Sequence, residues 1–199
     1  MKAFIRSTLA ASALALTAAA TADITVPSGK YTLEKTHGYI TFTYSHLGFS
    51  NPQIGFDSFD VDLDLDAANP AASSLSVTVD ATSVNSRVEV FDEHLNDDKL
   101  FNTDEFPSIS FTSTGMEALG DDKFKVMGDL TIKGITKPVV LDASINKTGN
   151  NPFSKKPTVG VSATAKVMRS EWDMSYATPA VSDEVTISIE VELQGNPDS

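Results

Sequence analysis

Phe59-Asp60-Val61-Asp62-Leu63-Asp64-Leu65-Asp66 alternates strictly between an apolar residue and an aspartate. A β-strand turns successive side chains to opposite faces, so this stretch predicts a strand with one apolar face and one row of carboxylates. A helix would spread the four aspartates around its axis and bury some of them. The strand therefore belongs to an antiparallel sheet with water on one face. We interpret the aspartate row as a solvated face and not as a pair of catalytic carboxylates.

The same period of two returns along the whole chain. Residues of one phase are apolar in four further stretches: 75–79, 139–145, 159–167 and 185–193. Strands that each have one dry face must close into a barrel or pack as two sheets. A barrel of about eight to ten strands can enclose a ligand, whereas two packed sheets fill the space between them with side chains. Periodicity alone does not decide between the two.

The first 22 residues are expected to lie outside the fold. Lys2 and Arg6 form a basic start, an apolar run follows, and Ala20-Thr21-Ala22 is an A-x-A cleavage sequence. This arrangement is typical of a secretory signal peptide and is too short and alanine-rich for a membrane span. We therefore divide the chain into a signal peptide, residues 1–22, and one domain, residues 23–199, and we do not expect an integral membrane protein.

Charge and cysteine content narrow the class further. The formal charge of −12 becomes −14 once Lys2 and Arg6 are removed, which excludes binding of nucleic acid through the overall field. The chain has no cysteine and hence no disulfide or thiol chemistry. An exported, soluble chain without disulfides indicates a bacterial periplasm.

Local signals predict where the strands are interrupted. We expect an irregularity near His37-Gly38, loops over 46–56 and 146–157, and a turn at Asp121-Asp122. Apolar residues recur at helical spacing in 86–97, which predicts a short helix with Ser86 as its N-cap.

The domain contains only two arginines, Arg87 and Arg169. Arg169 continues the inward phase of the strand before it, and a buried guanidinium needs an anion or several acceptors. Two interpretations remain open. One is an internal ion pair with Asp92, Glu171 or Asp173. The other is a clamp for the phosphate or carbonyl head group of a ligand.

The three histidines are His37, His46 and His94. Zinc sites usually place histidines at close, regular spacing. His37 and His46 differ by nine positions and would lie on opposite faces of a regular strand, so we predict no metal site. Structural histidines, or polar groups at the mouth of a pocket, are the preferred interpretation.

At this point the sequence resembles the YceI-like family of periplasmic polyisoprenoid-binding proteins with a lipocalin-like barrel. The most specific segment is Gly128–Pro138, which matches a G-x-L-T-x-x-G-x-T-x-P pattern. His37 before Ile40-Thr41-Phe42, the segment 106–111, and Arg169 with Trp172 and Met174 extend the similarity over nearly the whole domain. One departure is Asp173, which stands where a glycine often follows the aromatic residue and is expected to alter the turn near Arg169.

The resemblance implies an all-β fold, an extended antiparallel lipocalin-like β-barrel with a short helix, that holds an isoprenoid lipid such as a quinone or a polyprenyl phosphate. It implies no catalysis and no cofactor apart from this ligand. We expect a monomer or homodimer. From strand phase and resemblance together, the candidate ligand-binding residues are Phe42, Tyr44, Phe49, Phe59, Val77, Arg87, Asp92, His94, Phe111, Leu141, Val161, Arg169 and Trp172. The alternatives are a stress-response or interaction module with a packed interior, and a quinone-related enzyme.

Overall fold

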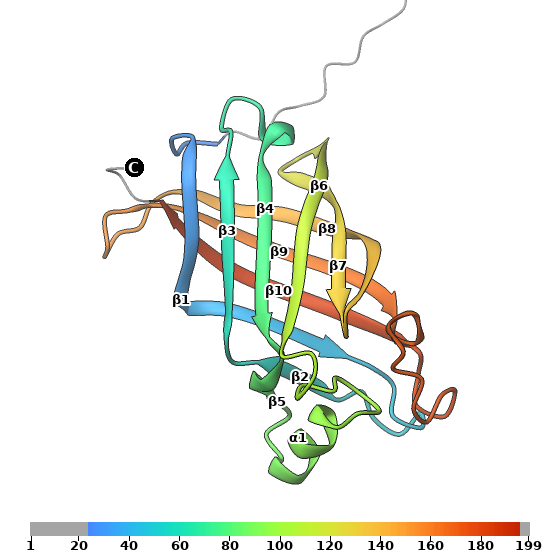
Figure 1. Cartoon of the computed structure of the whole chain (residues 1–199). Coiled ribbons are helices and arrows are strands. Elements are labelled where there is room, and N and C mark those ends of the chain that lie inside the picture. Colours follow the sequence, from blue (N-terminus) through green and yellow to red (C-terminus); the bar gives the residue numbers. More distant parts are fainter. Residues whose placement is uncertain (1–23, 196–199) are drawn as a thin grey trace, which may run out of the picture.

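The structure is a computed structural model that describes residues 24–195, so the predicted signal peptide lies outside the described residues. Eight long strands form a closed antiparallel barrel (Figure 1). In chain order they are β1 (Gly29–Thr43), β3 (Phe59–Leu65), β4 (Ser74–Asp80), β6 (Ser108–Gly120), β7 (Lys123–Ile132), β8 (Ile135–Asn150), β9 (Pro157–Met168) and β10 (Glu184–Gly195). Each strand pairs with its neighbour, and β10 pairs with β1 to close the ring. The predicted fold class is confirmed.

The remaining elements gather at one end of the barrel. Two short strands, β2 (Gln53–Phe56) and β5 (Val84–Asn85), extend the sheet beside the second half of β1. Helix α1 (Glu89–Asn96) follows β5 and lies beyond this end of the barrel (Figure 1). Three short 3₁₀ turns complete the fold: η1 (Pro70–Ala72), η2 (Ala81–Ser83) and η3 (Arg169–Trp172).

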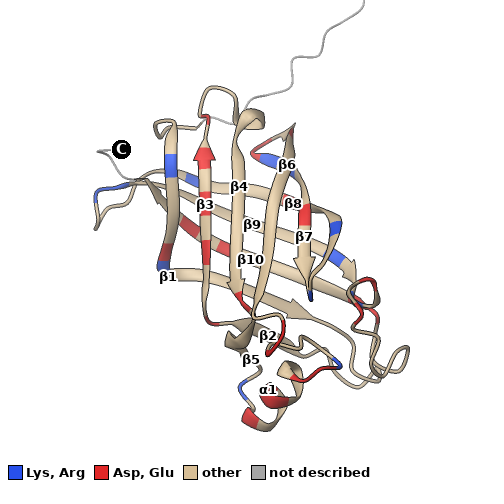
Figure 2. Cartoon of the chain, in the orientation of Figure 1, with Lys and Arg blue, Asp and Glu red and all other residues tan. Residues whose placement is uncertain are grey.

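Strand β3 shows why the chain closes in this way. Its four apolar residues are buried and its three aspartates are exposed, as the alternation predicts. On the outer face, Lys30 lies 2.5 Å from Asp64 and Lys35 lies 2.8 Å from Asp60, so neighbouring lysines partly offset the carboxylate row (Figure 2). These exposed pairs contribute little stability, and the apolar stripe carries the folding energy.

Strand β1 turns sharply at a bulge, which confirms the irregularity predicted near His37-Gly38. Leu33 pairs with Leu193, and the next pair is Gly38 with Val191. The first half of β1 pairs with β3 and the second half with β2, so the bulge is the corner between them. Glycine fits closely there, because a Cβ atom at Gly38 would lie 2.7 Å from Cδ1 of Leu33 and displace that side chain.

Three local predictions need correction. The stretch 46–56 contains strand β2, and β8 continues to Asn150, so the loop predicted over 146–157 is confined to 151–156. In both cases pairing with a distant strand imposes extended structure on residues that favour turns. Ser86 does not cap α1, which begins at Glu89. Its backbone N–H instead donates to Oδ1 of Asp92 at 2.6 Å.

The end of the barrel far from α1 is filled with side chains. Tyr31, Val159 and Leu193 are at most 2% exposed there, with Leu65 and Phe124 also buried. The hydroxyl of Tyr31 donates to the backbone oxygen of Pro27 at 2.6 Å, so even its polar atom is satisfied. This end is a packed core.

Candidate ligand cavity

The other half of the barrel is hollow. A cavity of about 480 Å³ opens at the α1 end, within the range of roughly 300–1,000 Å³ that is typical of small-molecule sites. Seven of the eight long strands supply its walls, each from the half nearest α1; within the described residues, β3 does not line it. The side chains that face it are mostly aliphatic or aromatic, with Val77, Ile109, Val139, Leu141, Ile187 and Ile189 among them. The predicted alternative of a completely packed interior does not agree with this cavity.

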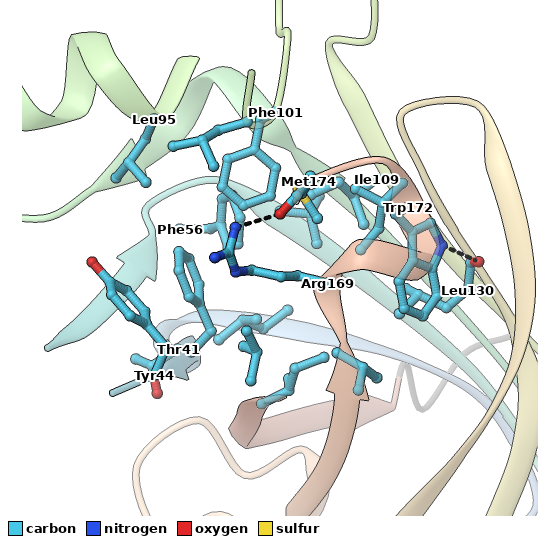
Figure 3. A pocket seen from close by; sticks show the side chains of 18 of the residues that line it. Thr41, Tyr44, Phe56, Leu95, Phe101, Ile109, Leu130, Arg169, Trp172 and Met174 are labelled. Carbon is cyan, nitrogen blue, oxygen red and sulfur yellow. Dashed lines mark hydrogen bonds between the residues drawn. The ribbon is translucent and has the colours of Figure 1, made fainter. Parts of the chain in front are cut away.

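An aromatic cluster forms one wall near the mouth. The ring centroids of Phe42, Phe56 and Phe101 lie 5.6–5.8 Å from one another in tilted and edge-on orientations. Figure 3 shows Phe56 and Phe101 beside the guanidinium of Arg169. Aromatic rings at such distances and angles attract one another, which stabilises this wall.

The mouth is built by α1 and two loops, 44–52 and 173–183. The loops are joined by backbone bonds, including Leu47 N–H to the oxygen of Ala180 at 3.1 Å and Ser182 N–H to the oxygen of Ser45 at 2.9 Å. Tyr176 of the second loop contacts His94 of α1 edge-on, with ring centroids 5.4 Å apart. The three segments therefore form one connected rim.

Arg169 is buried between the cavity and this rim. Its Nε donates to the backbone oxygen of Ser182 at 2.9 Å, and its Nη2 donates to those of Tyr176 and Val181 at 2.8 and 3.1 Å. Nη1 donates to the backbone oxygen of Met174, as Figure 3 shows. Four of the five guanidinium N–H groups are thus used to hold the 173–183 loop. Burial lowers the pKa of Arg169, while Asp183 and Tyr44 act in the opposite direction.

The internal ion pair that was one interpretation of Arg169 is not formed. No carboxylate of the described residues lies within 4.0 Å of this guanidinium, and backbone oxygens take the place of Asp92, Glu171 and Asp173. Asp183 makes no ion pair with Arg169 either, and its carboxylate accepts from Ser170 N–H at 2.8 Å and from Ser170 Oγ at 2.6 Å.

The η3 turn places Trp172 against the cavity wall. Its side chain is fully buried, and its indole N–H donates to the oxygen of Leu130 at 3.3 Å. Asp173 ends the turn with φ +57°, a conformation that glycine adopts most easily. The turn nevertheless closes normally, because Met174 N–H still reaches the oxygen of Arg169 at 3.3 Å. The departure at Asp173 leaves the position of Arg169 intact.

Eight of the thirteen candidate residues line the cavity: Phe42, Tyr44, Val77, His94, Phe111, Leu141, Arg169 and Trp172. Burial raises the pKa of the Tyr44 phenol, which therefore stays a hydroxyl and a hydrogen-bond donor.

The other five candidate residues are not among those that line the cavity. Phe49 is 89% exposed on the tip of the 44–52 loop, and Arg87 is exposed with φ +69°. The carboxylate of Asp92 accepts a hydrogen bond from the backbone N–H of Ser86 and does not line the cavity. Phe59 and Val161 do not line the cavity: Phe59 is buried at the α1 end of β3, opposite Val79, and Val161 is partly buried farther along β9. Strand phase gives the face of a residue and says nothing about its depth.

Sequence reasoning also missed several lining residues. They come from loops and irregular segments, where no period marks the inward face: Leu47, Leu100, Met174, Tyr176, Ala177 and Val181. Lys133 is another omission, because only 6% of its side chain is exposed. Its Nζ donates to the oxygens of Asp98 and Asp173 at 3.1 and 3.0 Å, which ties the segment after α1 to the η3 turn.

Comparisons with known proteins agree with this architecture. The family model described as YceI-like domain matches residues 31–193. Protein YceI of Escherichia coli O17:K52:H18 is 35% identical over 159 residues, which cover 80% of this chain and 82% of that protein. The Campylobacter jejuni YCEI protein superposes with a TM-score of 0.69 at 33% identity, covering 76% of this chain and 90% of that one.

A more distant neighbour shares the fold. It is a polyisoprenoid binding domain from Saccharophagus degradans, with a TM-score of 0.63 at 13% identity, covering 85% of this chain and all of that one. Among the described residues, no helix is long and apolar enough to cross a membrane.

Proposed function

The chain belongs to the YceI-like family, and from this premise we propose that it binds and carries a long-chain isoprenoid lipid. The observation that carries the proposal is the apolar cavity, open at the α1 end and floored by a packed core. Each CH₂ group that leaves water for such walls contributes roughly 0.8 kcal/mol, so a prenyl tail supplies ample driving force. The Saccharophagus domain of the same fold, described as polyisoprenoid binding, supports this choice of ligand class.

We assign the tail and the head of the lipid to different parts of the cavity. Val77, Phe111, Leu141 and their neighbours would contact the tail in the depth of the barrel. Phe42, Tyr44, His94 and Arg169 lie toward the rim and would surround the head, with Trp172 between the two regions. The Tyr44 hydroxyl is a donor suited to a carbonyl or hydroxyl of the ligand.

The use of Arg169 favours a neutral head group over a phosphate. Only one of its five N–H groups is left after the four bonds to backbone oxygens. A phosphate drawn into this apolar space would lose its hydration and meet a single free donor, which is unfavourable. A quinone or alcohol needs only one or two hydrogen bonds. Between the two head groups expected from the sequence, we therefore propose the quinone type.

The remaining parts of the proposal follow the sequence expectations. The protein would act in the periplasm after removal of residues 1–22, as a binding protein without catalysis and as a monomer or homodimer. The enzyme alternative would need a reacting group that faces the cavity, and turnover of a quinone that depends on Tyr44 or His94 would support it.

The test is to block the cavity and compare lipid content. Val77→Trp places an indole in the hollow part of the barrel, whereas Thr78→Trp, the matched control, places it on the exposed outer face of the same strand. Protein is purified from periplasmic extract and examined by native mass spectrometry and organic extraction. We expect isoprenoid lipid in the parent chain and in Thr78→Trp, and little in Val77→Trp. A parent protein that neither carries nor takes up lipid contradicts the proposal.

Head-group preference has a separate test. A prenyl quinone and a polyprenyl phosphate of equal tail length compete for the delipidated protein. The neutral lipid should bind about tenfold tighter or more, since one uncompensated buried charge easily exceeds 1.4 kcal/mol. Equal or reversed affinities would assign the phosphate a position in water outside the rim.

A further inference from the structure

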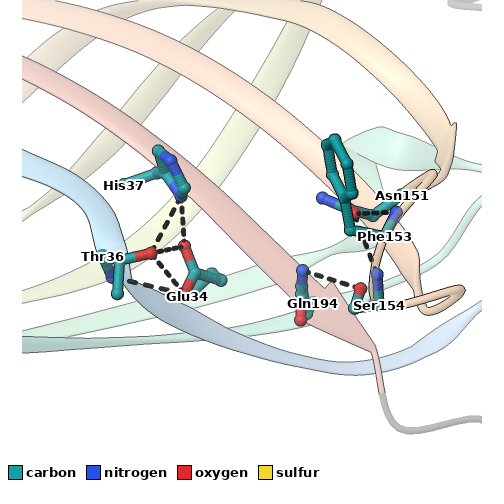
Figure 4. Close-up of polar contacts among 7 residues, drawn as sticks. All are labelled: Glu34, Thr36, His37, Asn151, Phe153, Ser154 and Gln194. Atoms are coloured by element: carbon teal, nitrogen blue, oxygen red, sulfur yellow. Dashed lines mark hydrogen bonds and ion pairs between the residues drawn. The ribbon is translucent and has the colours of Figure 1, made fainter.

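A group of metal-ligating side chains lies on the outer face of the barrel, away from the cavity. Glu34 and His37 belong to the bulge of β1, and Glu192 belongs to β10. The register there skips four residues of β1 while β10 advances past Glu192 alone, between the pairs Leu33–Leu193 and Gly38–Val191. The bulge thus brings two side chains that are three positions apart to the same place as one from a distant strand. Figure 4 shows Glu34 and His37 side by side at this corner.

The three side chains are close enough to bind one ion together. One ligand atom from each lies within 4.8 Å of the others, and His37 Nδ1 is 2.6 Å from Oε2 of Glu34. Zinc binds imidazole nitrogen and carboxylate oxygen at about 2.0–2.2 Å, so two of its ligand atoms are at most about 4.4 Å apart. Small rotations of these partly exposed side chains would bring all three atoms to one ion.

The charges around the group are suited to a cation. Within residues 24–195, neither Glu34 nor Glu192 pairs with a lysine or an arginine, and the nearby Lys35 is occupied by Asp60 at 2.8 Å. Two carboxylates neutralise a divalent ion, and one imidazole nitrogen favours zinc and similar transition metals over Mg²⁺ and Ca²⁺.

The local hydrogen bonds explain part of this arrangement, and a bound ion would replace the one between His37 Nδ1 and Glu34 Oε2. Glu34 accepts from Thr36 N–H at 3.3 Å and from Thr36 Oγ1 at 2.8 Å, which shapes the bulge. Neither bond involves Glu192, whose place opposite the bulge is fixed by the β1–β10 register. A purely structural role for Glu34 does not require a second carboxylate there.

We propose that Glu34, His37 and Glu192 form a binding site for a divalent transition-metal ion of the Zn²⁺ type. The ion would join β1 to β10 across the bulge, at the seam that closes the barrel. Three protein ligands leave a fourth position for water or for a donor from another molecule. The site is independent of what the cavity holds.

Isothermal titration of the untagged mature protein with ZnCl₂ tests the proposal. We expect one site per chain and a higher Tm in the presence of zinc, because an ion that binds only the folded state stabilises it. Loss of even an outer partner of a metal ligand lowers affinity about 10–100-fold, so His37→Gln and Glu192→Gln should each weaken binding at least tenfold. Mg²⁺ should not compete.

The matched control is Glu190→Gln, which removes an exposed carboxylate two residues away on the same strand and the same face. It should bind zinc as the parent chain does. The proposal is overturned if the parent chain shows no zinc binding, if His37→Gln binds as well as the parent, or if Glu190→Gln loses as much affinity as Glu192→Gln. None of these results bears on lipid binding, which is measured separately.

Discussion

The two halves of the barrel are built from the same strands and differ in what fills them. In the half far from α1, Tyr31, Phe124 and Leu193 are buried in the core, and none of them lines the cavity. In the half near α1, the same three strands carry Ile40, Ile132 and Ile187, which line the 480 Å³ cavity. Alternating apolar residues make the interior of the barrel apolar, and the size of the inward side chains then decides whether a cavity remains.

The polar groups of the two halves differ in the same sense. In the filled half, the Tyr31 hydroxyl is satisfied locally by Pro27. In the hollow half, the guanidinium of Arg169 donates to backbone oxygens of the 173–183 loop, so the cavity keeps a largely apolar surface. The hollow half is therefore prepared for a ligand at the cost of packing energy, and the filled half supplies stability.

The largest expected effect compares a large-to-small substitution in each half. Leu193→Ala, in the filled half, should lower the free energy of unfolding by about 2–5 kcal/mol, because it removes a well-packed side chain and leaves a void. Ile187→Ala should cost clearly less, since its side chain is only partly buried and already borders an empty space. Urea denaturation of both delipidated variants measures the difference. Equal losses would mean that the hollow half is packed in solution.

A second prediction concerns the rim of the hollow half. Arg169→Met keeps much of the side-chain volume and removes all donors, leaving the backbone oxygens of Met174, Tyr176 and Val181 without their partner. We expect a loss of about 2–3 kcal/mol, the cost of leaving buried acceptors unpaired, together with faster hydrogen exchange in 173–183. A variant that loses stability without faster exchange in this loop would show that Arg169 acts through the core instead.

A third prediction tests the wall between two strands. The ring of Phe111, which faces the cavity, lies over Gly128, and a Cβ atom there would come within 2.2 Å of its Cζ atom. Gly128→Ala must push this ring aside and also move the backbone oxygen of Thr112, which would lie 2.6 Å from the new Cβ, so we expect a loss of about 1–3 kcal/mol and weaker lipid binding. Gly115→Ala is the milder control, because its new Cβ would meet only the flexible end of Met127 at 3.2 Å. Similar effects of both substitutions would argue against a rigid contact at Phe111.

The sequence predicted the strands, the closed fold and the inward face of most residues, because these depend on local alternation and on a match to known motifs. It failed where distant pairing decides. Phe59 and Val161 have the inward phase but do not line the cavity, and nothing in the local sequence records this. Phe49 was expected in the wall because it is aromatic, yet backbone bonds of the 44–52 loop hold it outward.

The proposed zinc ligands show the same limit from the other side. The three histidines lack a metal-binding spacing, so the sequence predicted no site. The structure brings Glu34 and His37 together with Glu192, a residue more than 150 positions away, by means of a bulge. Only the pairing of the first and last strands reveals this group.

The smallest effect distinguishes the rim from the rest of the barrel by its response to acid. Bonds from Ser170 N–H and Oγ lower the pKa of Asp183 below its ordinary value. The folded chain then binds fewer protons at this carboxyl than the unfolded chain, so stability rises with pH in this range. The contribution is complete above the ordinary aspartate pKa of about 3.9 and is lost as the pH falls through the lower, folded-state pKa.

Asp183→Asn should therefore destabilise the protein slightly at pH 7 and leave it nearly unchanged near pH 2, when Tm values are compared with the parent chain. Because Asp183 also supports the charge of Arg169, the gap at pH 7 should appear first as faster hydrogen exchange in 173–183, while the filled half stays protected. A difference in Tm between the parent chain and Asp183→Asn that is constant from pH 7 to pH 2 would mean that Asp183 acts by its shape and not by its charge.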